Sequence, residues 1–345
     1  MKAFRGLDNI SVVGGLGALA FLGFLPTLFP GKYLIGVLTV AAIYGIWSVS
    51  WDFMSGLTGR ENFGHSLFIG VGAYTAGFLN VQFGWGPWWS LPASMVVAAF
   101  FGLILGFPTL RLRGPYFALA MLSAAVILQR LMLIFWEFTG GEEGIQDITP
   151  LIKDPLHYYW LVLALLGAIT WFLAWMARSR WGLILRAIRG DEATCLAAGL
   201  PITTYKIASL IISAAFAGLG GALYGHKMQF ISPDQFSVLQ SIDLLLMIVV
   251  GGLGSVHGAF LGALFLIVLP QLISLTKDSL PDAIALAPGL QSLVYGLVLI
   301  AFVLFEPMGL YGRWLKVRTY LQVFPFYRRG LFKRQKTFQK SERVR

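Results

Sequence analysis

The chain has 345 residues, of which 57% are hydrophobic and only 12% charged, and its mean hydropathy is +0.74. Soluble domains carry roughly a quarter charged residues, so this composition excludes an ordinary soluble domain. Apolar stretches of about 20 residues recur along the chain, and in lipid only helices and closed barrels satisfy their own backbone. Because the short alternating segments of a barrel are absent, the sequence predicts an all-α, polytopic transmembrane helical bundle.

The net charge of +10 comes from one end of the chain. Residues 311–345 hold eleven Lys and Arg residues against the single acid Glu342, and the rest is balanced. Beside a membrane domain, such a tail predicts retention in the cytoplasm and contact with anionic lipid. We therefore divide the chain into a transmembrane domain, 1–310, and a basic cytoplasmic tail, 311–345, and expect no nucleic-acid partner.

About ten spans follow one another along the chain. Their approximate ranges are 11–29, 33–54, 66–81, 90–107, 116–135, 158–176, 207–224, one that begins near 242, 259–275 and 290–305. The third and eighth are short, and each is also compatible with a broken or re-entrant half-helix. Trp85, Trp88 and Trp89 lie where an interfacial aromatic belt is expected.

The connections fix a predicted orientation. The loop 137–157 is acidic, whereas the segment 178–206 carries several Arg residues and is too polar for lipid. With the basic tail inside, alternation through ten spans also places the N-terminus and 178–206 inside and the acidic loop outside. The Lys- and Arg-rich segments then share one side, as they do in most multi-pass proteins.

Two glycine-rich turns resemble each other. Gly56 to Gly64 follows Asp52, and Gly252 to Gly262 follows Asp243. The similarity is compatible with a parallel internal repeat, or with a chance match in a chain that has 40 glycines.

Within the segment 178–206, residues 190–200 predict one short amphipathic helix. Asp191 is suited to its N-cap, Glu192 to its first turn, and the run Gly199-Leu-Pro201 to its end. A short helix held between two spans is a rigid lever, because packed helices shift as bodies. An ordinary connecting loop is the alternative.

No pattern predicts an enzyme. The four His residues are scattered, and P-loop, G-x-S-x-G and CxxC motifs are absent, so we expect no catalytic residue, metal or cofactor. The single cysteine, Cys195, permits no intrachain disulfide.

Four stretches resemble the permease subunit of a bacterial ABC importer of the high-affinity branched-chain amino acid type. They are GLTGRENFGH at 56–65 with GVGAYT at 70–75, LRLRGPYFA at 110–118, RAIRGDE at 186–192 with AG at 198–199, and GGLGS at 251–255. They occur in the family's order and cover roughly residues 35–310. Residues Arg60 to Phe63 include a charge pair, whereas the family usually has uncharged residues at this place. Thr194-Cys195 stands where the family commonly has Ala.

The resemblance implies roles for particular residues. Residues that would couple the permease to an ATPase are Arg186, Arg189, Asp191, Glu192, Ala193, Ala198 and Gly199. Residues that would line the translocation path are Asp52, Asn62, Gly64, His65, Tyr74, Asp243, Gly251, Gly252 and Gly254. Acids at membrane depth favour a functional role, although Asp52 and Asp243 are also placed to reach the cytoplasmic interface.

The resemblance further implies partners and a location. These are two ATP-binding subunits, a second permease subunit, an extracytoplasmic solute-binding protein, and the bacterial inner membrane with both termini in the cytoplasm. The expected solutes are branched-chain amino acids, with urea, short amides or another small solute as the alternative within the family. An ion-coupled secondary transporter is the alternative of another class.

Overall fold

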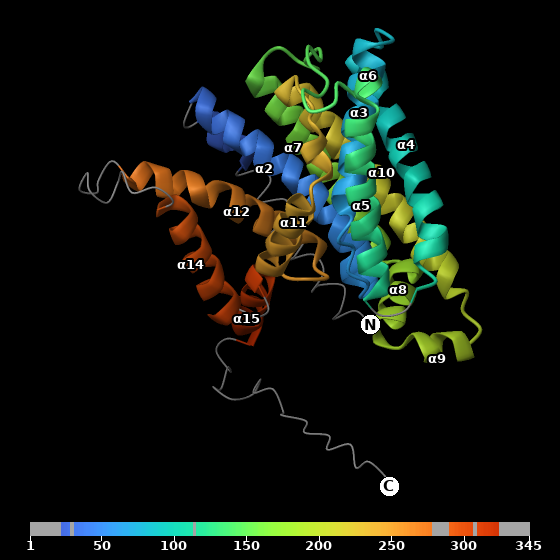
Figure 1. Cartoon of the computed structure of the whole chain (residues 1–345). Helices are drawn as coiled ribbons and strands as arrows, with labels where there is room; N and C mark the ends of the chain where they lie inside the picture. The colour runs from blue at the N-terminus through green and yellow to red at the C-terminus, as the bar shows by residue number, and fades with distance from the viewer. Residues whose placement is uncertain (1–21, 28–30, 113–114, 278–289, 306–308, 324–345) are drawn as a thin grey trace.

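The computed structural model describes residues 22–27, 31–112, 115–277, 290–305 and 309–323. These residues form helices joined by short connections, and the only β pairing among them is one isolated bridge between Ile145 and Ile231. The all-α expectation is therefore confirmed. The helices gather into one bundle, with α8 (Arg180–Gly190) and α9 (Glu192–Ala197) at one end and α6 (Trp136–Thr139) at the other (Figure 1).

The longest helix, α10 (Ile202–Met228), lies at the centre of the bundle and packs along α3 (His65–Val81) and α4 (Pro87–Thr109). Small residues make this close approach possible. A side chain at Gly72 would collide with the backbone of Gly218, and one at Gly221 would collide with the backbone of Ile69. In lipid, where apolar surfaces gain little from leaving the solvent, such close backbone contact drives helix association.

A second group of helices packs on α2 (Lys32–Trp51), which continues as the π-helix η1 (Asp52–Gly56). It contacts α7 (Pro155–Arg178), α10 and α12 (Val256–Lys277). Most of this 25-residue span is buried inside the protein. By contrast, α5 (Tyr116–Ile134) buries only Phe117, Ala118, Met121 and Ala125, and its other residues are exposed or half-buried.

The eighth predicted span is a broken helix. The helix α11 (Val238–Gly251) has 14 residues, follows the short 3₁₀ turn η2 (Pro233–Phe236), and meets α12 at a bend of 114°. The bend lies at Gly252 and Gly254, whose φ angles of 113° and 80° are open to glycine at little cost. The expectation of broken or re-entrant helices is confirmed here.

The remaining spans agree with the sequence to different extents. Five described helices are long and apolar enough to cross a membrane, and a sixth span results if the bent pair counts as one. The third predicted span is α3, of 17 residues, and the tenth is α14 (Leu290–Phe305), of 16. The first predicted span lies largely outside the described residues.

Two other features refine the sequence-based boundaries. The acidic loop at the α6 end is folded: Ile145 pairs with Ile231, and the carbonyl of Thr149 contacts Nδ1 of His226 at 2.8 Å. The first part of the predicted tail is the helix α15 (Gly309–Val323), which packs on α11 and α12. The rest of that tail lies outside the described residues.

Candidate functional site

The segment 178–206 contains two helices where the sequence predicted one. The second, α9, begins at the predicted cap: Asp191 accepts hydrogen bonds from the amide of Ala193 at 2.9 Å and the hydroxyl of Thr194 at 2.5 Å. These hydrogen bonds hold the pKa of Asp191 below its ordinary value. The helix is followed by Ala198 and by Gly199 at φ 78°, as a glycine C-terminal cap predicts.

The first helix, α8, lies before the predicted range 190–200 and is an addition to the sequence-based expectation. Its buried face is Gly182, Leu185 and Ile188, a spacing of three that places them on one side of a helix. Arg186 donates from Nη2 to the carbonyl of Ala177 at 2.8 Å, which fastens α8 to the end of α7.

Arg189 connects α8 to the transmembrane core. Its Nη1 donates to the carbonyl of Gly56 at 2.5 Å, and the same atom lies against Gly254. The aliphatic part of Arg189 lies against Gly59, where a side chain would collide with it. One guanidinium therefore contacts both glycine-rich turns.

The two turns also bind each other directly. Oδ1 of Asp52 accepts a hydrogen bond from the amide of Gly254 at 2.6 Å, although the two residues are 202 positions apart. Asp52 is fully buried. Oδ1 of Asp52 thus caps the turn between α11 and α12. The end of α2, the helix α8 and the broken helix meet at this point.

Glu192 forms the second connection. Its Oε1 accepts from Nε and Nη2 of Arg60, at 3.0 and 2.8 Å, and from Nζ of Lys206 at 2.5 Å. Arg60 also donates to the carbonyl of Leu112 at 3.1 Å, beyond the end of α4. Burial by itself raises the pKa of Glu192, but the hydrogen bonds from Lys206 and Arg60 outweigh it, and the pKa lies below its ordinary value. We use the name junction for the cluster formed by Arg189, Glu192 and Asp52 with the residues that they contact.

Three of the predicted path residues, Asn62, Gly64 and His65, make local contacts around the turn that follows η1. The side chain of Asn62 accepts from the amide of Gly64 at 3.0 Å, its carbonyl accepts from the indole of Trp51 at 2.7 Å, and Gly64 abuts the carbonyl of Met121. His65 is buried, with Nε2 at 3.1 Å from the hydroxyl of Ser50. These contacts shape the turn between η1 and α3, close to the junction.

Tyr74, Asp243 and Gly251 lie apart from those residues. The ring of Tyr74 stacks against Phe236 of η2, with ring centroids 5.5 Å apart. Gly251 packs against the backbone of Gly258. Asp243 is exposed on α11, which packs on α2. The predicted path residues therefore do not form one site: some lie at or next to the junction, Gly251 ends α11 beside the break, and Tyr74 and Asp243 lie separately on α3 and α11.

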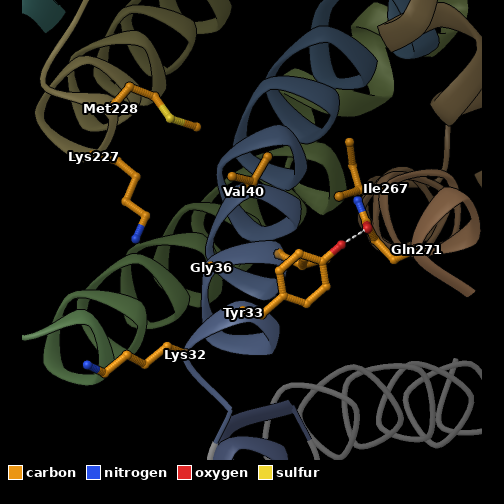
Figure 2. Close-up of a pocket in the computed structure, with 9 residues that line it drawn as sticks. Lys32, Tyr33, Gly36, Val40, Lys227, Met228, Ile267 and Gln271 are labelled. Atoms are coloured by element: carbon orange, nitrogen blue, oxygen red, sulfur yellow. Dashed lines mark hydrogen bonds between the residues drawn. The ribbon is translucent and has the colours of Figure 1, made fainter. Parts of the chain in front are cut away.

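A hollow lies at the other end of α2. It has a volume of about 330 Å³ and is lined by α2, the end of α10 and α12, including Lys32, Tyr33, Val40, Lys227 and Gln271. Figure 2 shows Tyr33 and Gln271 pointing toward one another across it, joined by a hydrogen bond from the tyrosine hydroxyl. The ammonium of Lys227 lies 5.8 Å from the ring centroid of Tyr158 on α7. Among the described residues, no group of three or more His, Cys, Asp or Glu side chains could hold a metal ion.

Residues 33–303 match the model of a family described as the branched-chain amino acid transport system permease component. The chain belongs to this permease family. Its members are components of a transport system, so the chain is by family a permease and not an enzyme. Its apolar helices make it a multi-pass membrane protein.

Named relatives agree with the family. The chain is 33% identical over 268 residues to the high-affinity branched-chain amino acid transport system permease protein LivM of Salmonella typhimurium, and 32% identical to LivM of Escherichia coli. Each alignment covers 69% of this chain and 63% of the relative, so the chain spans less than two thirds of the length of these relatives. A probable branched-chain permease LivM of Methanocaldococcus jannaschii is 24% identical over 78% of this chain and 90% of its own. No solved structure matches the chain.

Proposed function

We propose that this permease forms the translocation path of an ATP-driven importer for branched-chain amino acids. The names of its relatives, which are branched-chain amino acid permeases, support the solute class. Permeases for urea or short amides are the alternative within the family, because the run Arg60 to Phe63 departs from the more usual sequence. For either solute class, a separate receptor would select the solute, and the permease would make few contacts with the solute.

The observation that carries the proposal is the junction. Arg189 and Glu192 belong to a segment outside the spans, yet they bind Gly56 and Arg60 at the inner end of α2. Through Gly254 the same cluster reaches the break between α11 and α12. A displacement of α8 and α9 would therefore move the ends of three membrane helices together, because packed elements shift as bodies.

The partners follow from this mechanical role. We propose that α9 and the exposed side of α8 dock on one of two ATP-binding subunits, and that a second permease and an extracytoplasmic solute-binding protein complete the importer. Arg186, Ala193, Ala198 and Gly199 would shape the docked segment. Glu192 was expected on the docking surface, but its carboxylate binds Arg60 and Lys206, so we assign it to anchoring α9.

The location and orientation are part of the same proposal. We place the chain in the bacterial inner membrane with both termini in the cytoplasm. The Arg-rich segment 178–206 and the basic helix α15 lie toward one end of the bundle, and the acidic loop at the other (Figure 1). The positive-inside rule places the end with α8 and α9 in the cytoplasm. Contact of the tail with anionic lipid follows from the same orientation.

Reconstitution tests the proposal against both alternatives. The full importer in proteoliposomes should take up radiolabelled L-leucine only with internal ATP and an external loaded binding protein. A protonophore or a sodium ionophore should leave the initial rate unchanged. Uptake that persists without ATP and collapses with the ionophore would establish a secondary transporter, and uptake of urea in place of leucine would establish the other solute class.

A further inference from the structure

One face of α2 is a stripe that runs from the hollow toward the middle of the membrane. Tyr33, Val37, Val40, Tyr44 and Trp47 are separated by four, three, four and three residues, which places them on one side of a helix. The first four are exposed or half-buried, whereas most of α2 is buried. The hollow of Figure 2 is lined by the first three, so the stripe begins at its floor.

At its inner end the stripe meets an aromatic cluster. The ring centroids of Tyr44 and Trp47 are 4.5 Å apart, and Trp47 lies 5.6 Å from Tyr224 of α10. Tyr44 is the thirteenth of the 25 residues in the span Lys32–Gly56, so this cluster lies halfway along the span.

An exposed carboxylate stands beside this cluster. Asp243 lies on α11, which packs against α2 and α14, the two helices that carry Tyr44 and Tyr295. It makes no hydrogen bond or ion pair with any residue that the structure describes. The neighbouring Leu239, 71% exposed, and Ile242, 37% exposed, show that this side of α11 is open. A charged side chain at this depth cannot face lipid at low cost, and such residues face a water-filled path or the interior of an assembly.

We propose that Asp243, flanked by Tyr44 and Tyr295, receives the ammonium group of the transported solute at mid-membrane depth. Aromatic faces beside a carboxylate form a favourable site for a small cation. The apolar residues Val37 and Val40 lead to it from the hollow and suit a branched aliphatic side chain. The inference rests on the proposed function and deepens it: the path itself, and not only the receptor, would require an amino group on the solute.

The test is leucine uptake by the full importer in proteoliposomes, measured together with ATP hydrolysis. Asp243→Asn should lower the leucine carried per ATP about tenfold, because it removes one hydrogen bond between charged groups. ATP hydrolysis stimulated by the receptor should persist. Asp243→Glu should restore most of the uptake. Tyr44→Phe should keep it and Tyr44→Leu should lower it, because only the phenylalanine retains an aromatic face. Asp147→Asn, which removes an exposed carboxylate from the acidic loop, is the matched control and should behave as wild type.

Three results would overturn the proposal. The first is Asp243→Asn transport within about twofold of wild type, a change smaller than the loss of one hydrogen bond to a charge. The second is equal loss in Asp243→Glu, which would show that the carboxylate is not what matters. The third is dissociation of the second permease from the Asp243→Asn variant, which would make Asp243 a subunit contact. Failure of the wild-type importer to carry leucine at all would instead refute the proposed function.

Discussion

Nη1 of Arg189 donates a hydrogen bond to the carbonyl oxygen of Gly56 over 2.5 Å, and this contact joins two parts of the chain that lie 133 residues apart. The carbonyl belongs to the last residue of η1, at the end of a mostly buried span. Single turns of π-helix are rare and frequently occur at functional sites. The guanidinium thus holds the π-helical end of α2 to the segment that we propose as the docking surface.

Arg189→Lys should uncouple ATP hydrolysis from uptake. An ammonium lacks the planar fork that lets Arg189 reach the Gly56 carbonyl while it lies against Gly254. We expect leucine uptake per ATP to fall about tenfold, the cost of one hydrogen bond to a charged group. Proteoliposome uptake and phosphate release, measured in the same sample, check the ratio. Arg130→Lys, at an exposed position of α5 away from the docking segment, is the control, and equal behaviour of both variants would remove Arg189 from the coupling route.

Arg60 and Glu192 should show coupled effects on stability. They form a half-buried pair at 2.8 Å, with side chains 12% and 31% exposed. In a double-mutant cycle of Arg60→Ala and Glu192→Ala, we expect an interaction free energy of about 1 kcal/mol. Unfolding of the purified permease in detergent measures it. Glu61→Ala, which removes the exposed acid next to Arg60, should leave the melting temperature unchanged. Strict additivity would mean that the pair contributes nothing.

The same carboxylate predicts a pH dependence. Because the pKa of Glu192 in the folded protein lies below the ordinary value of 4.5, its contribution to stability is complete above that value. It is lost as the pH falls through the lower pKa of the folded state. The difference in melting temperature between wild type and Glu192→Gln should therefore be constant near neutral pH and shrink in acid below pH 4.5. A difference that grows in acid would reverse the sign and refute the assignment.

The fold was predictable where apolar length alone decides it. The ranges 116–135 and 158–176 differ from α5 and α7 by at most three residues at either end, because about 20 apolar residues are what a bilayer requires. The helix α8 is not apparent from hydropathy because its apolar run, 181–185, is short and lies between Arg180 and Arg186, so the average over the segment is low. Its three-residue spacing at Gly182, Leu185 and Ile188 was the available signal.

The site was predictable only in part, because its contacts join distant residues. Local rules identified Asp191 as a cap and Gly199 as a helix end. They gave no indication that Glu192 would turn toward Arg60 and Lys206, since nothing in a single sequence pairs residues 132 positions apart. Arg60 was noted as a departure from the family pattern, and its role emerges from the fold. The spacing of Tyr33, Val40 and Tyr44 is the signal in the sequence for the stripe on α2, but spacing alone does not tell an exposed stripe from a buried one.

Close packing at Gly72 supplies the last prediction. A Cβ at Gly72 would collide with the backbone of Gly218, which a rotamer change cannot relieve, so Gly72→Ala should separate α3 from α10. Overpacking of this kind costs about 1–3 kcal/mol. Gly296→Ala is the matched control, because a Cβ there meets no atom within 4 Å, and alanine favours a helix over glycine by about 1 kcal/mol. Thermal unfolding in detergent should therefore move the two variants in opposite directions, and a melting temperature of Gly72→Ala at or above that of Gly296→Ala would contradict the close contact between α3 and α10.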